Sequence, residues 1–386
     1  MDVCNVLHSR VFAMSANTSL FRYSLPSIIA LCAAMLLPAP GLAEERLVVA
    51  DVLETPATQS RHAQRSLQLA VTQAGQRLVA VGERGIVQLS DDEGRSWRQA
   101  SHVPVSVTLT DVEFVSAERG WAVGHSGVLL SSTDGGENWS LVMDGNQAAQ
   151  IVLQGAQQQL ANGAEGAERA VRSAEYLVAD GPDKPFLDVT FASPSRGYLI
   201  GAYGLALETR DGGQSWQSLV ERIPNPRGNH LYQMQIRGQE IVIAGEQGVL
   251  FRSLDGGQSF SQLSAPYAGT FFGVLGLQGD GLLVYGLQGN AWRSTDGGGS
   301  WQQVDVGQSA SLAAGLRLSD GTLLLADESG RLLHGRQDAS RFAALAVQSP
   351  ASITDLLQTA DGALVLAGVR GMQRIEQHEL DAGVSP

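Results

Sequence analysis

The sequence predicts an all-β protein, a seven-bladed β-propeller, and three observations support this fold class. An eight-residue motif occurs five times, a shorter glycine motif occurs seven times at a nearly constant spacing, and 45 of the 386 residues are glycine. Abundant glycine indicates many turns, and therefore many short strands. Repeats of about 40 residues with four short strands each are typical of propeller blades.

The longer motif has the pattern S/T-x-D-x-G-x-x-W/F. Its Asp carboxylate can accept backbone N–H groups across a turn, and the glycine that follows tolerates a positive φ. We expect each copy to form the hairpin between the third and fourth strands of a blade, with the aromatic ring packing inward. The residues with this structural role are Asp92, Trp97, Asp134, Trp139, Asp211, Trp216, Asp255, Phe260, Asp296 and Trp301.

The shorter motif, G-x-x-G, precedes each longer motif and recurs twice beyond the last one. Its copies start at residues 82, 124, 201, 245, 286, 327 and 368, the sixth with Asp327 in place of the first glycine, which predicts seven blades. The interval between the second and third copies is the one that is too long. Its extra residues, about 147–180, are rich in Ala, Gln and Glu, so we expect a small helical insertion between blades 2 and 3.

The last repeat contains only three predicted strands, at residues 353–358, 364–367 and 372–376. A propeller ring must close, because open sheet edges invite aggregation. We expect the strand Leu47–Val52 to supply the missing fourth strand, so that the N-terminal part of the chain closes the last blade.

The N-terminal residues are typical of an export signal. Arg22 is followed by an apolar run, Ile28–Leu37, and by small residues up to Ala43. The run is too short to span a membrane. We therefore expect a signal peptide at 1–43, cleaved after Ala43, with Met14 as an alternative start, and an exported, periplasmic propeller at 44–386.

Composition excludes several classes of function. The net charge of −13 argues against nucleic acid or an anionic membrane as the partner. Both cysteines, Cys4 and Cys32, lie in the predicted signal peptide, so the mature chain has no thiol chemistry. The histidines form no ligand-spaced pair, and we expect no metal and no cofactor. We expect the mature protein to be a monomer.

Two phrases extend the motif pattern. Residues 119–127 read RGWAVGHSG and residues 196–204 read RGYLIGAYG, and each leads into a longer motif. Together with the longer motif, which is the Asp-box of BNR repeats, they resemble the photosystem II stability/assembly factor family. That resemblance implies an exported, non-catalytic, seven-bladed propeller that helps to assemble a membrane or envelope protein complex.

A glycoside hydrolase of the sialidase type, or a carbohydrate-binding propeller, is the alternative, because such proteins also carry Asp-boxes. A sialidase needs three arginines, a Tyr nucleophile with a Glu partner, and an acid. The tripeptide Arg222-Ile223-Pro224 follows the third Asp-box instead of preceding the first, and is expected to be a loop. A cluster of three arginines beside a Tyr–Glu pair would favour the enzyme.

The G-x-x-G turns share one face with the connections between blades, so their middle residues are expected to surround the mouth of the central channel. Arg84 and Arg370 come from the first and seventh blades, which are neighbours in a closed ring. They are expected either to hold a carboxylate of a protein partner or to be solvated turn residues. The predicted binding residues are Arg84, His125, Tyr203, Glu246, Gln288 and Arg370, with Glu328 in the sixth blade.

Overall fold

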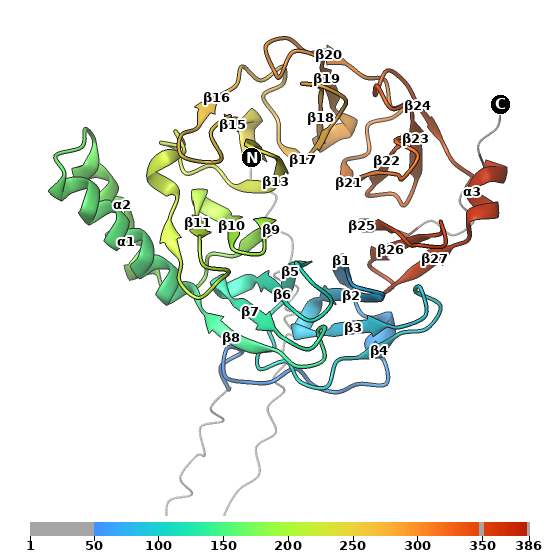
Figure 1. Cartoon of the computed structure of the whole chain (residues 1–386), viewed down its shortest axis with the longest axis horizontal. Helices are drawn as coiled ribbons and strands as arrows, with labels where there is room; N and C mark the ends of the chain where they lie inside the picture. Colours follow the sequence, from blue (N-terminus) through green and yellow to red (C-terminus); the bar gives the residue numbers. More distant parts are fainter. Residues whose placement is uncertain (1–49, 347–350, 384–386) are drawn as a thin grey trace, which may run out of the picture. The chain divides into compact units, whose positions relative to one another are not determined.

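The computed structural model describes residues 50–346 and 351–383, which form seven antiparallel sheets arranged in a ring (Figure 1). Each sheet is one blade, with its first strand innermost, and the blades follow one another in chain order. Within these residues six blades have four strands and the seventh has three. The predicted seven-bladed β-propeller is confirmed.

The strands agree with the repeat pattern. In blades 1 to 4 they are Gln68–Ala74 (β1), Arg77–Gly82 (β2), Val87–Ser90 (β3), Arg98–Gln99 (β4); Leu109–Phe114 (β5), Gly120–Gly124 (β6), Leu129–Ser132 (β7), Ser140–Met143 (β8); Phe186–Ser193 (β9), Arg196–Gly201 (β10), Ala206–Thr209 (β11), Gln217–Ser218 (β12); Leu231–Arg237 (β13), Glu240–Gly245 (β14), Leu250–Ser253 (β15) and Ser261–Gln262 (β16). In blades 5 to 7 they are Phe271–Gly276 (β17), Leu282–Gly286 (β18), Ala291–Ser294 (β19), Gln302–Gln303 (β20); Leu312–Arg317 (β21), Leu323–Asp327 (β22), Leu332–Gly335 (β23), Phe342–Ala344 (β24); Ile353–Gln358 (β25), Leu364–Gly368 (β26) and Gln373–Ile375 (β27).

The hydrophobic core lies between the blades. Apolar side chains of consecutive blades meet face to face, as Val79 and Leu89 of blade 1 do with Leu130 and Trp139 of blade 2. Both faces of each sheet are therefore covered, and the second strand of each blade is almost wholly buried. Fully burying one such side chain contributes about 1.5–3 kcal/mol, so the stability of the ring depends on every blade-to-blade interface.

Blade 7 closes the ring directly on blade 1. Val71 and Leu78 of blade 1 pack with Val365 and Ala367 of blade 7. The Val71 N–H also donates to Asp355 Oδ2 at 2.8 Å. The closing interface thus combines apolar burial with a hydrogen bond between the innermost strands.

The predicted closing strand Leu47–Val52 is wrong for the part that the structure describes, residues 50–52; residues 47–49 lie outside the described part. The Val52 carbonyl accepts from Ser106 N at 2.9 Å, and Ala57 N donates to the Val103 carbonyl at 3.0 Å. This segment therefore lies on the connection from blade 1 to blade 2. It satisfies backbone groups there, and it adds no strand to β27.

A short helix follows β27 in the place where the other blades turn into a fourth strand. This helix, α3 (Gln377–Gly383), places Leu380 against the core between blades 6 and 7, next to Leu345. It covers the side of blade 7 that faces blade 6. A further short 3-10 helix, η1 (Ala63–Arg65), precedes β1.

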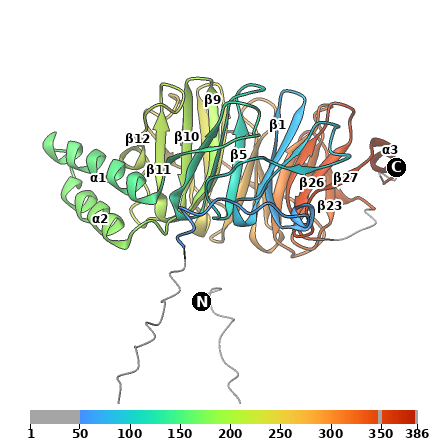
Figure 2. The ribbon, with the colours of Figure 1, turned by 90° about the horizontal axis from the view of Figure 1, so that it is seen from below.

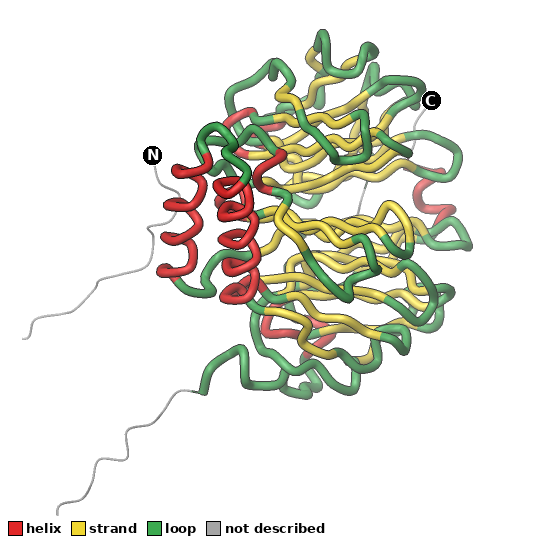
Figure 3. Tube along the Cα trace, turned by 60° about the vertical axis from the view of Figure 1, so that its left-hand side comes forward, coloured by secondary structure: helices red, strands yellow, loops and turns green. Residues whose placement is uncertain are grey.

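The helical insertion is confirmed. It consists of α1 (Gly145–Ala161) and α2 (Ala167–Asp180), which lie side by side outside the blades (Figures 1, 2 and 3). A capping box starts α1: Gln147 N donates to Asp144 Oδ1, and Asp144 N donates to Gln147 Oε1, both at 3.0 Å. Helix α1 buries Val152 and Ala156 between blades 2 and 3, whereas α2 packs mainly on α1.

The predicted signal peptide, 1–43, lies outside the described residues and stays a prediction. Among the helices that the structure describes, none has the length and apolar character needed to cross a membrane.

Candidate functional site

The G-x-x-G turns join the second and third strands of the blades, and they share one face of the ring with the connections between blades. We call it the turn face. In five of the turns the third residue is a non-glycine residue in the left-handed region, as at Arg84 and Tyr203, both with φ 56°. The final glycine is left-handed as well, and a Cβ at Gly85 would lie 2.2 Å from the Val105 carbonyl oxygen. This close approach explains why glycine ends the motif.

The second residue of each turn has a different task. Its N–H donates to the carbonyl just before the innermost strand, for example Glu246 N to the His230 carbonyl at 2.8 Å. Where it is glutamate, its carboxylate also accepts an N–H from that segment: Glu246 Oε2 accepts from His230 N, and Glu328 Oε1 accepts from Ser311 N, both at 3.1 Å. Glu83 accepts from Leu67 N in the same way. These carboxylates tie the turn to the innermost strand.

The predicted rim residues accordingly divide into two groups. Arg84, Tyr203, Gln288 and Arg370 occupy third positions, and their side chains are exposed. His125, Glu246 and Glu328 occupy second positions. Of these, His125 and Glu328 are exposed, whereas Glu246 is half-buried. Arg84 and Arg370 do lie on adjacent blades, since blade 7 packs on blade 1, but no hydrogen bond or ion pair among the described residues joins them.

Aromatic side chains gather on the turn face over blades 3 to 5. The Tyr203 and His230 rings lie 4.8 Å apart, His230 and Tyr232 6.4 Å apart, and Tyr232 and Phe272 5.3 Å apart between centroids. Tyr267 extends the group, through its edge-to-face contact with the buried Phe271. We call Tyr203, His230, Tyr232, Tyr267 and Phe272 the aromatic cluster.

Polar contacts hold the aromatic cluster in place. Tyr203 N donates to His230 Nδ1 at 2.9 Å. Lys184, just after the helical insertion, places its Nζ 5.0 Å from the Tyr203 ring centre. That ammonium is itself paired with Asp183 and, at 3.3 Å, with Asp180. Tyr203 is thus fixed from both sides, yet 61% of it remains exposed.

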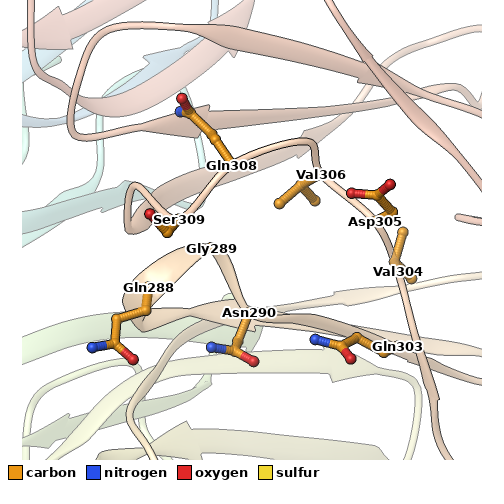
Figure 4. Close-up of a pocket in the computed structure, with 9 residues that line it drawn as sticks. All are labelled: Gln288, Gly289, Asn290, Gln303, Val304, Asp305, Val306, Gln308 and Ser309. Carbon is orange, nitrogen blue, oxygen red and sulfur yellow. The ribbon is translucent and has the colours of Figure 1, made fainter.

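A hollow of about 420 Å³ adjoins this cluster in blade 5. Figure 4 shows the turn that carries Gln288 and Asn290 on one side and the segment from Val304 to Ser309 on the other. Tyr267 Oη lies 3.4 Å from Gln288 Oε1, which connects the hollow to the aromatic cluster. The lining is mainly polar, with carboxamide groups at Gln288, Asn290, Gln303 and Gln308.

Below the turns, the innermost strands carry a series of side chains that bond to the next blade. Asp111 Oδ2 accepts from Val189 N at 2.8 Å, and Asp188 Oδ2 accepts from Met234 N at 3.3 Å. Gln233 Oε1 accepts from Val274 N at 2.8 Å, and Asp355 makes the corresponding bond to Val71 across the closing interface. Each bond satisfies an N–H on the inner edge of a strand, where no further strand can pair.

Burial raises the pKa of these carboxyl groups. It raises the pKa of Asp111 to about 6, of Glu113 to about 8 and of Asp355 to about 7, against the hydrogen bonds they accept. The pKa of Asp188 is also raised, by burial and then by the charges of Asp111 and Glu113. Desolvation disfavours the ionised form, and none of these groups has a cationic partner among the described residues.

On the opposite face the Asp-boxes form the predicted hairpins. In the third box, Asp211 Oδ1 accepts from Ser215 N at 2.9 Å, while Thr209 Oγ1 donates to the same oxygen and accepts from Gly213 N, both at 2.8 Å. The Ser215 hydroxyl and N–H lower the pKa of Asp211 to about 2. The corresponding hydrogen bonds recur in the other four boxes.

Arginines join these hairpins to the preceding blade. Arg119 donates to the Gly212 carbonyl of the next Asp-box, and Arg196 donates to the Gly256 carbonyl. Arg374 of blade 7 donates to the Glu93 carbonyl of blade 1, so the pattern also crosses the closing interface. These arginines are engaged within the ring and form no free patch.

The structure also bears on the alternative hydrolase. Tyr232 and Glu246 are neighbours, and burial followed by the Glu246 charge raises the pKa of the Tyr232 phenol. A raised pKa disfavours an ionised tyrosine nucleophile. No hydrogen bond, ion pair or cation–π contact among the described residues joins an arginine to either side chain. Arg222 instead donates to the buried Glu208 and to the Gly257 carbonyl. The described part of the chain also contains no His/Cys/Asp/Glu cluster arranged to hold a metal.

Sequence reasoning missed most of the aromatic cluster: it found Tyr203 but not His230, Tyr232 or Phe272 as site residues. A signal was available. The second residue of the innermost strand is half-buried in every blade, and it is aromatic only in blades 4 and 5; these residues are Leu69, Thr110, Leu187, Tyr232, Phe272, Ala313 and Thr354.

The fold and the turn face define a seven-bladed Asp-box propeller with an aromatic cluster on one face. This class of protein includes scaffolds and carbohydrate-active proteins. The chain belongs to the family described as "Photosynthesis system II assembly factor YCF48", which it matches over residues 96–159 and 172–371. The gap between the two matched segments, residues 160–171, falls at the junction of α1 and α2.

Two curated relatives resemble part of the chain. It is 40% identical over 77 residues to the "Photosystem II assembly lipoprotein Ycf48" of Synechococcus sp. (strain CC9902), and 33% identical over 89 residues to the chloroplastic "Photosystem II stability/assembly factor HCF136" of Arabidopsis thaliana. These segments make up 20% and 21% of this chain, and 23% and 21% of the respective relatives. The match therefore spans less than a quarter of either relative.

Solved structures share the fold. YCF48 from Cyanidioschyzon merolae superposes with a TM-score of 0.60 at 14% identity, covering 84% of this chain and 99% of that one. A YCF48 structure bound to a D1 peptide gives 0.58 at 16% identity, covering 81% and 93%. The GH74 xyloglucanase from Xanthomonas campestris gives 0.58 at 11% identity, covering 81% and 52%. At such identities the likeness concerns the fold.

Proposed function

We propose that this protein is an exported, non-catalytic scaffold that binds a segment of a membrane or envelope protein during assembly of its complex. Membership in the YCF48 family is the observation that carries the proposal. The solved YCF48 with a D1 peptide is a relative in fold that binds a polypeptide segment. The signal peptide predicted from the sequence supports export to the periplasm.

The turn face is the proposed contact surface. Its exposed third-position side chains take no part in holding the ring together; they are Arg84, Tyr203 and Gln288, which extend from left-handed turns, and Arg370. Arg84 and Arg370, on adjacent blades, would hold a carboxylate of the partner. His125 adds an exposed polar side chain in blade 2. Glu246 contributes indirectly, because its carboxylate accepts the His230 N–H and so positions His230.

A carbohydrate-active propeller is the second candidate, and the shared fold with a GH74 xyloglucanase favours it. Against catalysis stand the raised pKa of the Tyr232 phenol and the use of arginines as ties between blades. A sugar-binding function without catalysis would use the same face.

Affinity purification from envelope extracts, with residues 44–386 as bait and mass spectrometry as readout, tests the proposal. We expect one membrane protein or complex, retained less by the double variant Arg84→Glu/Arg370→Glu with an unchanged melting temperature. Arg172→Glu is the matched control, because Arg172 is exposed on α2, outside the blades (Figure 1). Retention on a glycan array with no protein partner would contradict the scaffold function. Unchanged capture of the partner by the double variant would show that Arg84 and Arg370 do not contribute to binding.

A further inference from the structure

We propose that the aromatic cluster, with the carboxamide-lined hollow beside it, binds an extended, uncharged segment of the partner protein that carries proline or aromatic side chains. This inference rests on the scaffold function and adds the chemistry of the partner. Arg84 and Arg370, which we call the arginine rim, lie on blades 1 and 7 and form a separate contact.

The position of Tyr203 is the first observation. The side chain is exposed although its backbone has φ 56°, a conformation that costs an L-residue roughly 1 kcal/mol. The equivalent positions of the other left-handed turns carry Arg84, Ser126, Gln247 and Gln288. A large exposed ring there has no structural task, since the turn forms equally well with small or polar side chains.

The second observation is that charged groups at the cluster already have partners. Lys184 is paired with Asp180 and Asp183, and Glu246 accepts the His230 N–H. His230 Nδ1 accepts from Tyr203 N. Among the described residues, the cation in contact with a ring of the cluster, Lys184, is thus paired with carboxylates, and the surface offers mainly ring faces and edges. A charged occupant would lose water there without gaining an ion pair, which favours an uncharged one.

The third observation is the geometry of the rings. Successive rings cross at 65°, 67° and 89°, so they form corners and no flat platform. A corner between edge-to-face rings surrounds the side of a proline or an aromatic ring, as in grooves that bind proline-rich peptides. A sugar ring stacks best on a flat aromatic face, which this arrangement does not provide.

The fourth observation is the hollow at the end of the cluster. Carboxamides such as Gln288 and Asn290 each offer donors and an acceptor, which match the alternating N–H and C=O groups of an extended backbone. The path from Tyr203 to this hollow crosses blades 3, 4 and 5 in order. An extended segment fits that path, with its side chains at the rings and its backbone at the carboxamides.

Selection from a random 12-residue peptide library displayed on phage tests the proposal without a known partner. Residues 44–386 serve as the target. We expect enrichment of sequences rich in proline, aromatic and aliphatic residues and poor in charge. Enrichment of acidic sequences, or of none while a glycan array retains the protein, would overturn the proposal.

An enriched peptide, made synthetically, is then titrated by fluorescence anisotropy. Tyr203→Ala should weaken its Kd at least about tenfold, as expected for loss of an aromatic anchor. Tyr176→Ala, which removes a 72% exposed tyrosine from α2, is the matched control and should change nothing. An equal Kd for Tyr203→Ala and wild type would overturn the proposal.

Salt separates this site from the arginine rim. Affinity at an uncharged site should be nearly constant between 50 and 500 mM NaCl, whereas a carboxylate held by Arg84 and Arg370 should bind more weakly at high salt. Phe272→Ala, with its melting temperature measured in parallel, gives a second variant within the cluster. A selection that enriches no peptide would overturn the proposal, while the affinity purification from envelope extracts would still test the scaffold function independently.

Discussion

Substitution of Asp355 tests how the ring closes. Its Oδ2 accepts the Val71 N–H across the interface between blades 7 and 1, at 2.8 Å, and Val71 is buried. Asp355→Ala leaves that donor without a partner, which costs about 1–3 kcal/mol. For a chain of this size, 1 kcal/mol corresponds to roughly 1–2 °C in melting temperature. Asp355→Asn keeps an acceptor oxygen and should lose much less at low pH.

The contribution of Asp355 to the free energy of unfolding depends on pH, and its direction follows from the pKa of the carboxyl group. Burial raises the pKa of Asp355 to about 7, whereas the unfolded chain releases the proton near pH 4. The stability that this group contributes is therefore complete below pH 4 and is lost as the pH rises to about 7. Asparagine cannot ionise, so Asp355→Asn avoids the loss, which is at most about 1.4 kcal/mol per pH unit in that range.

Urea unfolding followed by circular dichroism at pH 4.5 and pH 8 measures both effects. We expect Asp355→Ala to be less stable than wild type at pH 4.5. We expect Asp355→Asn to be close to wild type at pH 4.5 and more stable than wild type at pH 8. If Asp355→Ala matched wild type at pH 4.5, or Asp355→Asn were equally destabilised at both pH values, closure through this hydrogen bond would be refuted.

Three further substitutions test the ties within and between blades. Asp211→Ala removes the acceptor at the centre of the third Asp-box and should lower the melting temperature. Because the pKa of Asp211 is lowered to about 2, the stability that it contributes is present above pH 4 and is lost between pH 4 and pH 2. Acid unfolding of wild type and variant, compared over this pH range, measures the loss. Glu246→Ala frees the His230 N–H and should cost about 1 kcal/mol in urea unfolding, whereas Glu246→Gln should cost less. Arg196→Ala breaks the bond to the Gly256 carbonyl and the cation–π contact within blade 3, and should lower the urea midpoint, whereas wild-type stability in that variant would show that the tie contributes nothing.

The blades could be predicted from the sequence because their signals are local. Each Asp-box is an eight-residue unit whose Ser or Thr, Asp and Gly bond to one another, as Thr209, Asp211 and Gly213 do. Five Asp-boxes, together with the seven copies of the shorter glycine motif, imply seven blades. The helical insertion was likewise visible as an interval that is too long and lacks turn signals.

Ring closure could not be predicted in the same way, because it depends on residues almost 300 positions apart. The sequence indicated correctly that blade 7 lacks a strand, but not where the segment before Leu53 binds. In its described part, that segment contacts the connection after β4, where the Val52 carbonyl accepts from Ser106 N. No periodic pattern marks such a contact.

The site was predictable only in part, because the two middle residues of each G-x-x-G turn look equivalent in sequence and differ in space. The second residue, such as Glu246, turns back to the innermost strand, while the third, such as Tyr203, points outward from a left-handed backbone. Only the third residue is free to vary without loosening the ring. Binding function is therefore expected at third positions, and carboxylates at second positions are expected to be structural.

The helical insertion lies next to the proposed binding surface. The family match is interrupted at 160–171, within the helical hairpin, and α2 ends at Asp180, whose carboxylate pairs with Lys184. Lys184 in turn lies against the Tyr203 ring. Residues 160–171, where the match is interrupted, form the junction of the two helices, whereas Asp180 and Lys184 lie in the matched segment 172–371. The contact of the helical hairpin with the Tyr203 ring therefore does not by itself distinguish this chain from its family.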